Sequence, residues 1–318
     1  MNFRGANNGL LLGFDIGGTK CAVVLGSDAE GQPVVLAREA FATLPGPEAN
    51  LDRMLAIASR LLVEKGHGPA RAVGISCGGP LDSKSGRVFS PPNLPGWDDV
   101  PVADIVAGAL GLPAQLENDA NACALAEWMW GAGIGTSNMA FLTCGTGMGA
   151  GLILDGRLYR GACDLAGEIG HVRIAPDGPD CHGKAGSFEG LCSGAGISRL
   201  ASSLAGWPPG TAASEVFAAA AAGDRDARRV VETAGDALGC GIALLIDILN
   251  LEAVVVGSIF ARQENLLRPA MEAAIAREAL PRAAAACRVL PARLGDAVGD
   301  FAALAIAKLA HTNPSASP

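Results

Sequence analysis

Residues Leu10–Gly26 read LLLGFDIGGTKCAVVLG. Two apolar runs flank Gly17-Gly18, and this arrangement predicts a β-hairpin with a glycine turn. A second stretch of the same design, NMAFLTCGTGMGAGLILDG, spans Asn138–Gly156. The two stretches lie about one domain length apart. We therefore expect two related lobes, each opening with a turn of the size that suits a phosphate group.

The rest of the chain mixes apolar strands with helices, so we expect an α/β protein. Proline, serine and glycine mark residues 80–97 as a loop. After the first hairpin, we expect a strand over 33–41, a helix over Leu51–Lys65, a strand over Arg71–Gly79, a helix over Val102–Leu110, a strand over 113–118 and a helix over 120–132. After the second, we expect helices within Gly196–Asn250, a strand over 252–258, a helix over Asn265–Glu278, a strand over 288–294 and a helix over Asp300–Leu309.

Composition argues against several classes of partner. The 318 residues carry a formal charge of −8 without a cluster of Lys and Arg, which disfavours nucleic acid and anionic membranes. Residues 1–15 hold too short an apolar run for a signal peptide. The most apolar stretch, 239–260, is interrupted by Asp247, Asn250 and Glu252, so it predicts a buried helix and strand rather than a membrane span. Nine cysteines without a CxxC pair indicate reduced thiols and a cytoplasmic protein.

The turn DIGGTK, Asp15–Lys20, can point several backbone N–H groups at one anion. Gly17, Gly18 and Thr19 would form such a nest without side-chain bulk. The Asp15 carboxylate would repel a phosphate, so we expect it to bind Mg²⁺ through a water molecule. The turn is not a P-loop, because the GxxxxGK[ST] pattern is absent. Taken alone, the motif fits an ordinary Gly-Gly turn equally well.

The second glycine stretch, CGTGMGAG over Cys144–Gly151, fits a dinucleotide-binding fingerprint by letter. Gly145, Gly147 and Ala150 take the small-residue positions, and Glu168 lies downstream. That fingerprint needs a helix after the glycines, but the alternating residues of LILDGRLYRG predict another strand. A strand–turn–strand loop suits the β- and γ-phosphates of ATP better.

The segment ENDAN, Glu117–Asn121, lies at a predicted strand end just before a helix. Asn and Asp are preferred helix caps, and a cap is the simpler interpretation of the segment alone. A carboxylate at such a junction can also serve as the general base for a substrate hydroxyl. Beside two phosphate-binding turns, the second interpretation becomes the stronger one.

Two carboxylates and an imidazole are spaced through one glycine-rich region. Glu168 and His171 lie within GEIGH, and Glu189 follows. Carboxylates accept pairs of hydrogen bonds from neighbouring hydroxyls, so this set could bind several hydroxyls of a sugar. In a neutral loop, the same residues could be ordinary surface side chains.

Six motifs occur in the order seen in the ROK family (repressor, open reading frame, kinase): DIGGTK, SPPNLPGW, ENDANACALAE, GTGMGAGLILDGRLYRG, AGEIGH and GSFEGLCSG. The sequence resembles this family from about Leu11 to Leu309. The resemblance implies the two-lobed actin-like ATPase (ribonuclease H-like) fold with a cleft between the lobes. It places residues 1–120, joined by a C-terminal helix at about 299–310, in the N-terminal lobe and residues 121–298 in the C-terminal lobe.

The resemblance also implies an ATP-dependent sugar kinase that uses Mg²⁺. Asp119 is the implied catalytic base. The implied sugar-binding residues are Gly78, Gly79, Asn93, Asn118, Asp119, Glu168, His171 and Glu189. The implied phosphate-binding residues are Asp15, Gly17, Gly18, Thr19, Lys20, Gly145, Thr146 and Gly147. Near the adenosine, the family usually has two glycines, where this chain has Gly257-Ser258.

The stretch CHGKAGSFEG, Cys181–Gly190, departs from the family pattern. ROK proteins usually carry CxCGxxGCxE, whose three cysteines bind zinc with the histidine of the preceding motif. Alignment on the shared glycines and glutamate puts three other residues at the cysteine positions: Asp180, His182 and Ser187. Cys181 is one position out of register.

A structural zinc site needs four good ligands, and Ser187 is a poor one, so we expect no metal in this loop. Zinc supplies much of the ordering energy of small loops. We therefore expect packing by Phe188 and Leu191, or hydrogen bonds, to order the loop and deliver Glu189 to the sugar.

The expected substrate is glucose, phosphorylated at the 6-hydroxyl. N-acetylmannosamine, N-acetylglucosamine, mannose and allose remain open, because the same Glu and His set can serve each. A repressor of the family would need an added N-terminal DNA-binding domain, for which the predicted strand at Leu10 leaves no room. A catalytically silent sugar sensor is a further alternative, and so is an ATPase chaperone or filament protein of the same fold, against which the Glu and His set after Gly167 argues. The resemblance alone implies a homodimer.

Overall fold

The structure, a computed structural model, describes residues 9–28, 33–64 and 69–312. These residues form two compact units. Unit 1 contains the chain up to Ile134, the short segment Gly161–Asp164 and the chain from Asp296 onward, and unit 2 contains Gly135–Arg160 and Leu165–Gly295. Residues 1–8, on which the expectation about a signal peptide partly rests, lie outside the described residues.

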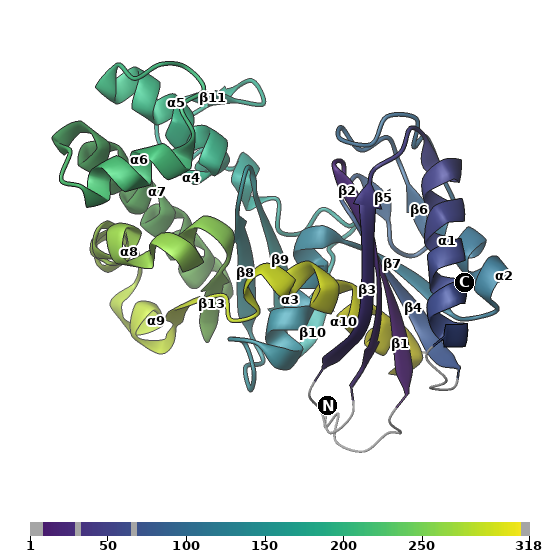
Figure 1. Ribbon diagram of the computed structural model, residues 1–318. Coiled ribbons are helices and arrows are strands. Elements are labelled where there is room, and N and C mark those ends of the chain that lie inside the picture. The colour runs from purple at the N-terminus through teal and green to yellow at the C-terminus, as the bar shows by residue number, and fades with distance from the viewer. Residues whose placement is uncertain (1–8, 29–32, 65–68, 313–318) are drawn as a thin grey trace. The chain divides into compact units, whose positions relative to one another are not determined.

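Unit 1 is built on a five-stranded sheet in the order β3-β2-β1-β4-β7 (Figure 1). Strands β1 (Leu10–Ile16), β2 (Lys20–Ser27) and β3 (Val34–Ala42) are antiparallel, while β4 (Ala70–Cys77) and β7 (Ala114–Asn118) run parallel to β1. Alternate residues of β1 are buried in one core with residues of α1 (Pro47–Glu64) and α2 (Val102–Leu110). The predicted first hairpin is therefore confirmed.

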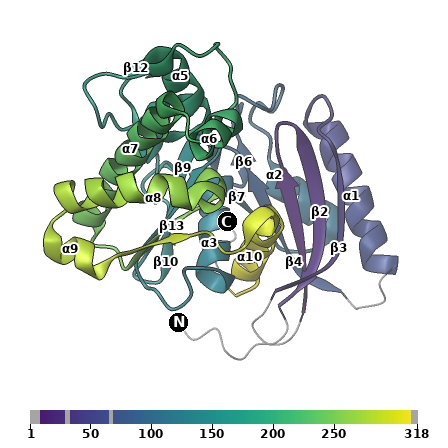
Figure 2. The same ribbon diagram turned by 60° about the vertical axis from the view of Figure 1, so that its left-hand side comes forward.

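Helices α3 (Asp119–Trp130) and α10 (Val298–Thr312) cover the opposite face of this sheet (Figure 2). Strand glycines let α10 come close, because a Cβ at Gly74 would lie only 2.1 Å from the Ala303 carbonyl oxygen. Trp130, at the end of α3, packs edge-on against Phe301 of α10, with ring centroids 6.3 Å apart. Helix α3 belongs with this sheet to unit 1, which includes the chain up to Ile134.

Unit 2 repeats the topology of unit 1 in its own sheet, ordered β10-β9-β8-β13-β14. Strands β8 (Met139–Cys144), β9 (Met148–Leu154) and β10 (Arg157–Tyr159) are antiparallel, while β13 (Ala253–Val256) and β14 (Arg288–Pro291) run parallel to β8. Each sheet thus opens with a hairpin joined by glycines, as the sequence predicted.

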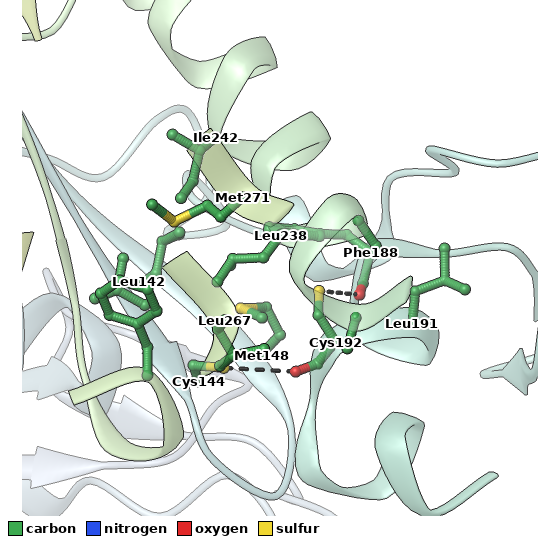
Figure 3. Close-up of a cluster of buried hydrophobic side chains, with 14 of the residues drawn as sticks. Leu142, Cys144, Met148, Phe188, Leu191, Cys192, Leu238, Ile242, Leu267 and Met271 are labelled. Atoms are coloured by element: carbon green, nitrogen blue, oxygen red, sulfur yellow. Dashed lines mark hydrogen bonds between the residues drawn. The ribbon is translucent and has the colours of Figure 1, made fainter. Parts of the chain in front are cut away.

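The helices of unit 2 bury a large apolar core against its sheet. They are α4 (Phe188–Cys192), α5 (Gly194–Ala205), α6 (Ala213–Ala221), α7 (Arg225–Leu249), α8 (Ser258–Glu278) and α9 (Pro281–Ala286). Figure 3 shows Leu142 and Met148 of the sheet packed with Leu238 of α7 and Met271 of α8. This core holds the short helix α4, which carries Glu189, against the sheet.

Some element boundaries differ from the sequence-based expectation. Helix α8 begins at Ser258 instead of Asn265, because its first turns follow β13 directly and bend at Gln263, whose backbone is not helical. Two short hairpins lie in segments expected to be loops: β5 (Leu81–Asp82) with β6 (Arg87–Val88), and β11 (Asp180–Cys181) with β12 (Lys184–Ala185). Within the described ranges, every helix falls short of the length and apolar character that crossing a membrane requires.

Candidate active site

Most of the predicted site residues of unit 1 lie at the carboxyl ends of three neighbouring strands, β1, β4 and β7. In the register of the sheet, Ile16 of β1 lies opposite Cys77 of β4, and Cys77 lies opposite Asn118 of β7. The residues that follow these positions meet at one edge, where open α/β sheets bind ligands. A Cβ at Gly78 would lie 4.0 Å from Oδ2 of Asp119.

Asn118 and Asp119, the two residues considered in ENDAN, are placed differently at the start of α3. The Asn118 Oδ1 accepts hydrogen bonds from the N–H groups of Ala120 (2.9 Å) and Asn121 (3.4 Å), so Asn118 is the cap of α3. Its Nδ2 lies 3.5 Å from where a Cβ at Gly79 would stand. Asp119 begins the helix and remains exposed, although its Oδ1 accepts from the Ala120 N–H at 2.8 Å.

The first hairpin turn is braced by residues that come later in the chain. Gly17 donates its N–H to the Lys20 carbonyl at 3.2 Å, and the Thr43 hydroxyl donates to the Gly17 carbonyl at 2.6 Å. A Cβ at Gly18 would lie 2.7 Å from the Asn93 carbonyl oxygen, so only glycine permits this approach. The contact brings Asn93, a predicted sugar-binding residue, beside the predicted phosphate-binding turn. Thr19 and Lys20 are exposed at the turn.

Asp15 stands in a partly buried group of carboxylates. Burial, with the neighbouring charges of Asp119 and Asp300, raises the pKa of Asp15 to about 6, although Lys20 and Arg38 act in the opposite direction. Arg38 donates through Nε to both carboxylate oxygens of Asp300 at 2.9 Å. Clustered carboxylate oxygens with too little opposing charge suit a hard cation such as Mg²⁺. The sequence analysis did not find Arg38 and Asp300.

The second hairpin turn, in unit 2, is braced by the start of a helix. Gly145 donates its N–H to the Gly147 carbonyl at 3.1 Å and closes the turn. The first residues of α5 donate to the turn, with Gly194 N–H 2.7 Å from the Gly145 carbonyl and Ala195 N–H 3.2 Å from the Thr146 carbonyl. These hydrogen bonds direct the carbonyl groups of the turn toward the helix.

Gly257 and Ser258 follow β13 and begin α8. A Cβ at Gly257 would lie 3.0 Å from Cζ of Phe141, which explains the glycine there. Ser258 has a φ of 49°, in the left-handed region that favours glycine. Its Oγ lies 3.7 Å from the position of a Cβ at Gly145. The serine that departs from the family pattern thus retains a glycine-like backbone beside the second turn.

Glu189 is held through both of its carboxylate oxygens. Oε2 accepts from the Met148 N–H at 2.9 Å, and Oε1 accepts from the Cys181 thiol and from Nε2 of His182, each at 3.0 Å. Burial acts to raise the pKa of Glu189, but the hydrogen bonds from Cys181, Met148 and His182 outweigh it and lower that pKa. The carboxylate is therefore ionised and fixed in place at neutral pH.

Glu168 and His171 are connected to Glu189 through a chain of contacts in unit 2. Nε2 of His171 is 3.7 Å from Oε2 of Glu168, and both side chains are 50% exposed. The rings of His171 and His182 are 4.9 Å apart, and His182 in turn contacts Glu189. The structure thus brings the three predicted sugar-binding side chains of unit 2 together through His182, whose contact with Glu189 the sequence analysis missed.

Residues 180–190, where the family has its zinc-binding motif and which we call the altered knuckle, begin with a small β-hairpin. Cys181 pairs with Lys184, and the turn residues His182 and Gly183 both have positive φ, of 54° and 71°. Two-residue hairpin turns with positive φ at both positions match the twist of their strands. Asp180 accepts a hydrogen bond from the Gly183 N–H at 3.2 Å and stabilises the turn.

Packing anchors the loop, as expected from the sequence. Ser187 caps α4 by accepting from the Gly190 N–H at 3.1 Å. Phe188 and Leu191 are buried in the core of unit 2, which confirms that they pack there (Figure 3). A Cβ at Gly241 of α7 would lie 2.4 Å from the Phe188 ring, so this glycine makes room for the ring.

Comparisons with known proteins agree with this geometry. The sequence profile of the ROK family matches residues 11–310. The chain is 33% identical to a glucokinase of Thermotoga maritima, over 94% of this chain and 97% of the relative. It is 34% identical to an N-acetylmannosamine kinase of Citrobacter koseri, over 80% of this chain and 85% of the relative.

Two solved structures extend the comparison. A ROK hexokinase from Thermus thermophilus superposes with a TM-score of 0.84 at 33% identity and covers 96% of this chain and 99% of its own. A ROK family glucokinase from Streptomyces griseus, solved with glucose and AMPPNP, gives a TM-score of 0.72 at 32% identity and covers 95% of this chain and 100% of its own.

Proposed function

Since the chain belongs to the ROK family and is an ATP-dependent sugar kinase, we propose that its substrate is glucose, phosphorylated on the 6-hydroxyl. The predicted family, the α/β two-lobed actin-like ATPase fold and the class of activity, transfer of phosphate to a sugar, are confirmed. The choice of sugar and the role of each residue are the substance of the proposal.

The observation that carries the proposal is the placement of Asp119. It is exposed at the carboxyl end of β7, next to the ends of β1 and β4, while Asn118 takes over the capping of α3. One carboxylate oxygen of Asp119 accepts from the Ala120 N–H, while the side chain as a whole stays exposed to solvent. A general base must reach the hydroxyl whose proton it accepts.

In the proposed mechanism, Asp119 accepts the proton of the 6-hydroxyl as this oxygen attacks the γ-phosphorus of ATP, and the bond from that phosphorus to the bridging oxygen breaks to release ADP. Phosphoryl transfer needs positioning and charge stabilisation more than covalent help from the protein. The backbone of the two hairpin turns holds the phosphates, with Lys20 beside the first turn and Gly257 near the adenosine. Mg²⁺, when bound, neutralises charge on the triphosphate, and Asp15 is the residue that would hold it through water.

The sugar is held by groups of known hydrogen-bonding capacity. Glu168 and Glu189 accept from hydroxyls, and His171 can donate or accept. Glu189 is fixed before the sugar arrives, which reduces the ordering that binding requires. The other proposed sugar-binding groups are Gly78, Gly79, Asn93 and the Nδ2 amide of Asn118.

We propose that the enzyme works without a structural zinc ion. Of the groups at the family's cysteine positions, Asp180 stabilises a turn and Ser187 caps a helix, so the family's set of ligands does not fit here. The buried Phe188 anchors the loop instead. After exhaustive chelation and restoration of Mg²⁺, we expect the activity of the untreated protein.

A variant of Asp119 tests the mechanism. Asp119→Asn keeps the shape of the side chain and removes the base, so kcat should fall by about 10²–10⁴-fold. Sugar affinity, measured by calorimetry, should change little. Turnover close to that of the wild type would remove Asp119 from the role of base.

A panel of sugars tests the substrate. ADP release with Mg-ATP should be fastest with glucose among glucose, mannose, allose, N-acetylmannosamine and N-acetylglucosamine, with a reaction lacking sugar as control. Similarity to an N-acetylmannosamine kinase makes that sugar the second candidate. Sugar binding without turnover on any member of the panel would identify a silent sensor.

We also propose that the protein is cytoplasmic and acts as a homodimer. All nine cysteines are free thiols, as expected in a reducing compartment. Light scattering should give twice the 32.0 kDa mass of the chain, and a mass of one chain would exclude the dimer.

A further inference from the structure

A thiol, an imidazole and a carboxylate converge at the tip of the altered knuckle in unit 2. Sγ of Cys181 and Nε2 of His182 each lie 3.0 Å from Oε1 of Glu189. All three atoms lie within 4.8 Å of one another. Cysteine, histidine and glutamate are the side chains that bind Zn²⁺ in proteins, at bond lengths of about 2.0–2.3 Å.

These separations are close to those of a tetrahedral site. Bonds of that length at tetrahedral angles place neighbouring ligand atoms roughly 3.3–3.8 Å apart. The two contacts to Oε1 therefore have to lengthen by only about half an ångström to admit an ion. The hydrogen bonds to Oε1 of Glu189 already hold the three ligand atoms together.

The surroundings hold two of the ligands and leave the third accessible. Cys181 is buried and paired in the β11–β12 hairpin, and the Met148 N–H fixes the other oxygen of Glu189 at 2.9 Å. Such bonds to the outer atoms of a ligand orient it for metal binding. The side chain of His182 is 60% exposed, which gives an ion a route from solvent.

We propose that Cys181, His182 and Glu189 bind a thiophilic divalent cation such as Zn²⁺, with water in the fourth position, and that the bound ion withdraws Glu189 from the sugar. Binding releases the thiol proton of Cys181 to solvent, and His182 binds as a neutral imidazole through Nε2 with its proton on Nδ1. The ion site is independent of the proposed function, whereas the competition with sugar rests on it.

This site differs from the family's knuckle in ligands and in consequence. Of the residues at the three cysteine positions, only His182 takes part, and the carboxylate comes from a proposed sugar-binding residue. An ion here inhibits the enzyme because it occupies Glu189. The loop needs no ion for its order, since Phe188 and the cap at Ser187 already supply it. The working enzyme is the metal-free form.

Titration of the metal-free protein with Co²⁺, without ATP or sugar, tests the site directly. We expect one Co²⁺ per chain with the charge-transfer absorption of a cobalt–thiolate bond, and displacement of Co²⁺ by Zn²⁺. In Cys181→Ser, the band should vanish and Zn²⁺ affinity should fall at least about tenfold. Cys163→Ser is the matched control, since Cys163 is an exposed thiol in unit 1, and it should keep the band.

Two results would overturn the site: cobalt binding without a thiolate band, or unchanged Zn²⁺ affinity in Cys181→Ser. If Cys181→Ser does not fold, as judged by circular dichroism, His182→Ala serves instead, because its side chain is largely exposed. His182→Ala should also bind Zn²⁺ at least about tenfold more weakly, and wild-type affinity would reject the proposal.

Kinetics at saturating Mg-ATP test the competition. Zn²⁺ should raise the KM for sugar and leave kcat unchanged, with full recovery on addition of a chelator that spares Mg²⁺. In Cys181→Ser, this inhibition should be lost relative to the variant's own metal-free rate. An effect on the KM for ATP, or inhibition that persists in Cys181→Ser, would contradict competition at Glu189. If no sugar is turned over, the proposed function fails, while the cobalt spectrum still decides the ion site.

Discussion

The turn at Gly17–Lys20 in unit 1 and the turn at Gly145–Gly147 in unit 2 each join the first two strands of a sheet, but different neighbours brace them. The first turn is tied down by Thr43 and by close contact with Asn93. The second is tied to the first turn of α5. One backbone design is thus supported in two ways.

The chemical surroundings of the two turns differ more than their backbones do. Asp15 at the first turn shares its surroundings with the charges of Asp119, Asp300 and Arg38. The second turn runs into Met148, whose N–H holds Glu189. The first turn therefore lies beside a group of interacting charged side chains, and the second is hydrogen-bonded to a carboxylate proposed to bind sugar.

The largest expected effect of a change at either turn is that of Asp15→Asn. If Asp15 holds Mg²⁺ through water, kcat with Mg-ATP should fall on the order of 10²–10³-fold. For the wild type, activity should decline as the pH falls through about 6, where Asp15 takes up a proton. A variant with nearly full activity would show that Asp15 does not hold Mg²⁺ during the reaction.

The same variant should be more stable than the wild type at neutral pH. The pKa of Asp15 is about 6 in the folded protein against 3.8 for the free group, so the folded state disfavours the ionised form. The resulting loss of stability is absent at pH values below 3.8, the pKa of the free group, and complete above about 6, the pKa in the folded protein. It reaches at most about 3 kcal/mol. Thermal unfolding should show a gain for Asp15→Asn at pH 7 that largely disappears at pH 4. An equal gain at both pH values would contradict this origin.

Glycine-to-alanine changes compare the bracing of the two turns. A Cβ at Gly18 would lie 2.6 Å from Cβ of Asn93 and 2.7 Å from its carbonyl oxygen, so the backbone itself must move. Gly18→Ala should lower the free energy of unfolding by about 1–3 kcal/mol, as measured by urea denaturation. Gly145→Ala is the control, since its Cβ would meet Ser258 at ordinary contact distances, with Oγ at 3.7 Å and Cβ at 4.0 Å. Equal losses in both variants would mean that Asn93 does not brace the first turn.

Gly147→Ala tests the link between the second turn and Glu189. Its Cβ would lie 3.0 Å from Oε2 of Glu189, so the carboxylate must move by a few tenths of an ångström. The KM for sugar should rise by about tenfold, which corresponds to about 1.4 kcal/mol. Gly145→Ala should act on the KM for ATP rather than on that for sugar. If Gly147→Ala changes only the KM for ATP, the turn and the sugar carboxylate are independent.

The positions of both turns could be predicted from sequence because the signal is local. Glycines between apolar runs specify a hairpin, and a strand end before a helix specifies where Asp119 stands. Which of Asn118 and Asp119 caps α3 was not predictable, since both residue types are good caps. Only the backbone geometry assigns the cap to Asn118.

The groups that distinguish the two turns come from distant parts of the chain. Asp300 lies near Asp15 because α10 packs on β1 and β4. In the sequence, only the glycines Gly13 and Gly74 within those strands indicated that a helix packs closely against them. The contacts of Cys181 and His182 with Glu189 depend on the hairpin turn at His182-Gly183. Matching the stretch to a zinc motif treated Cys181 as a residue out of register and hid its contact with Glu189.

The smallest expected effect concerns Ser258, beside the second turn. A left-handed backbone at a residue other than glycine costs roughly 1–2 kcal/mol, and glycine loses about 0.5–1 kcal/mol more entropy on folding than alanine. Ser258→Gly should therefore stabilise the protein by up to about 1 kcal/mol, seen as a small rise in Tm. Gly257→Ala is the contrasting variant and should lower Tm, because its Cβ would lie 3.0 Å from Phe141. If Ser258→Gly is less stable than the wild type, the hydroxyl supports the second turn. A more stable variant with a raised KM for ATP would show that the strained backbone of Ser258 is retained for nucleotide binding. The protein would then lose stability for the sake of ligand binding at the second turn, as it does at Asp15 beside the first.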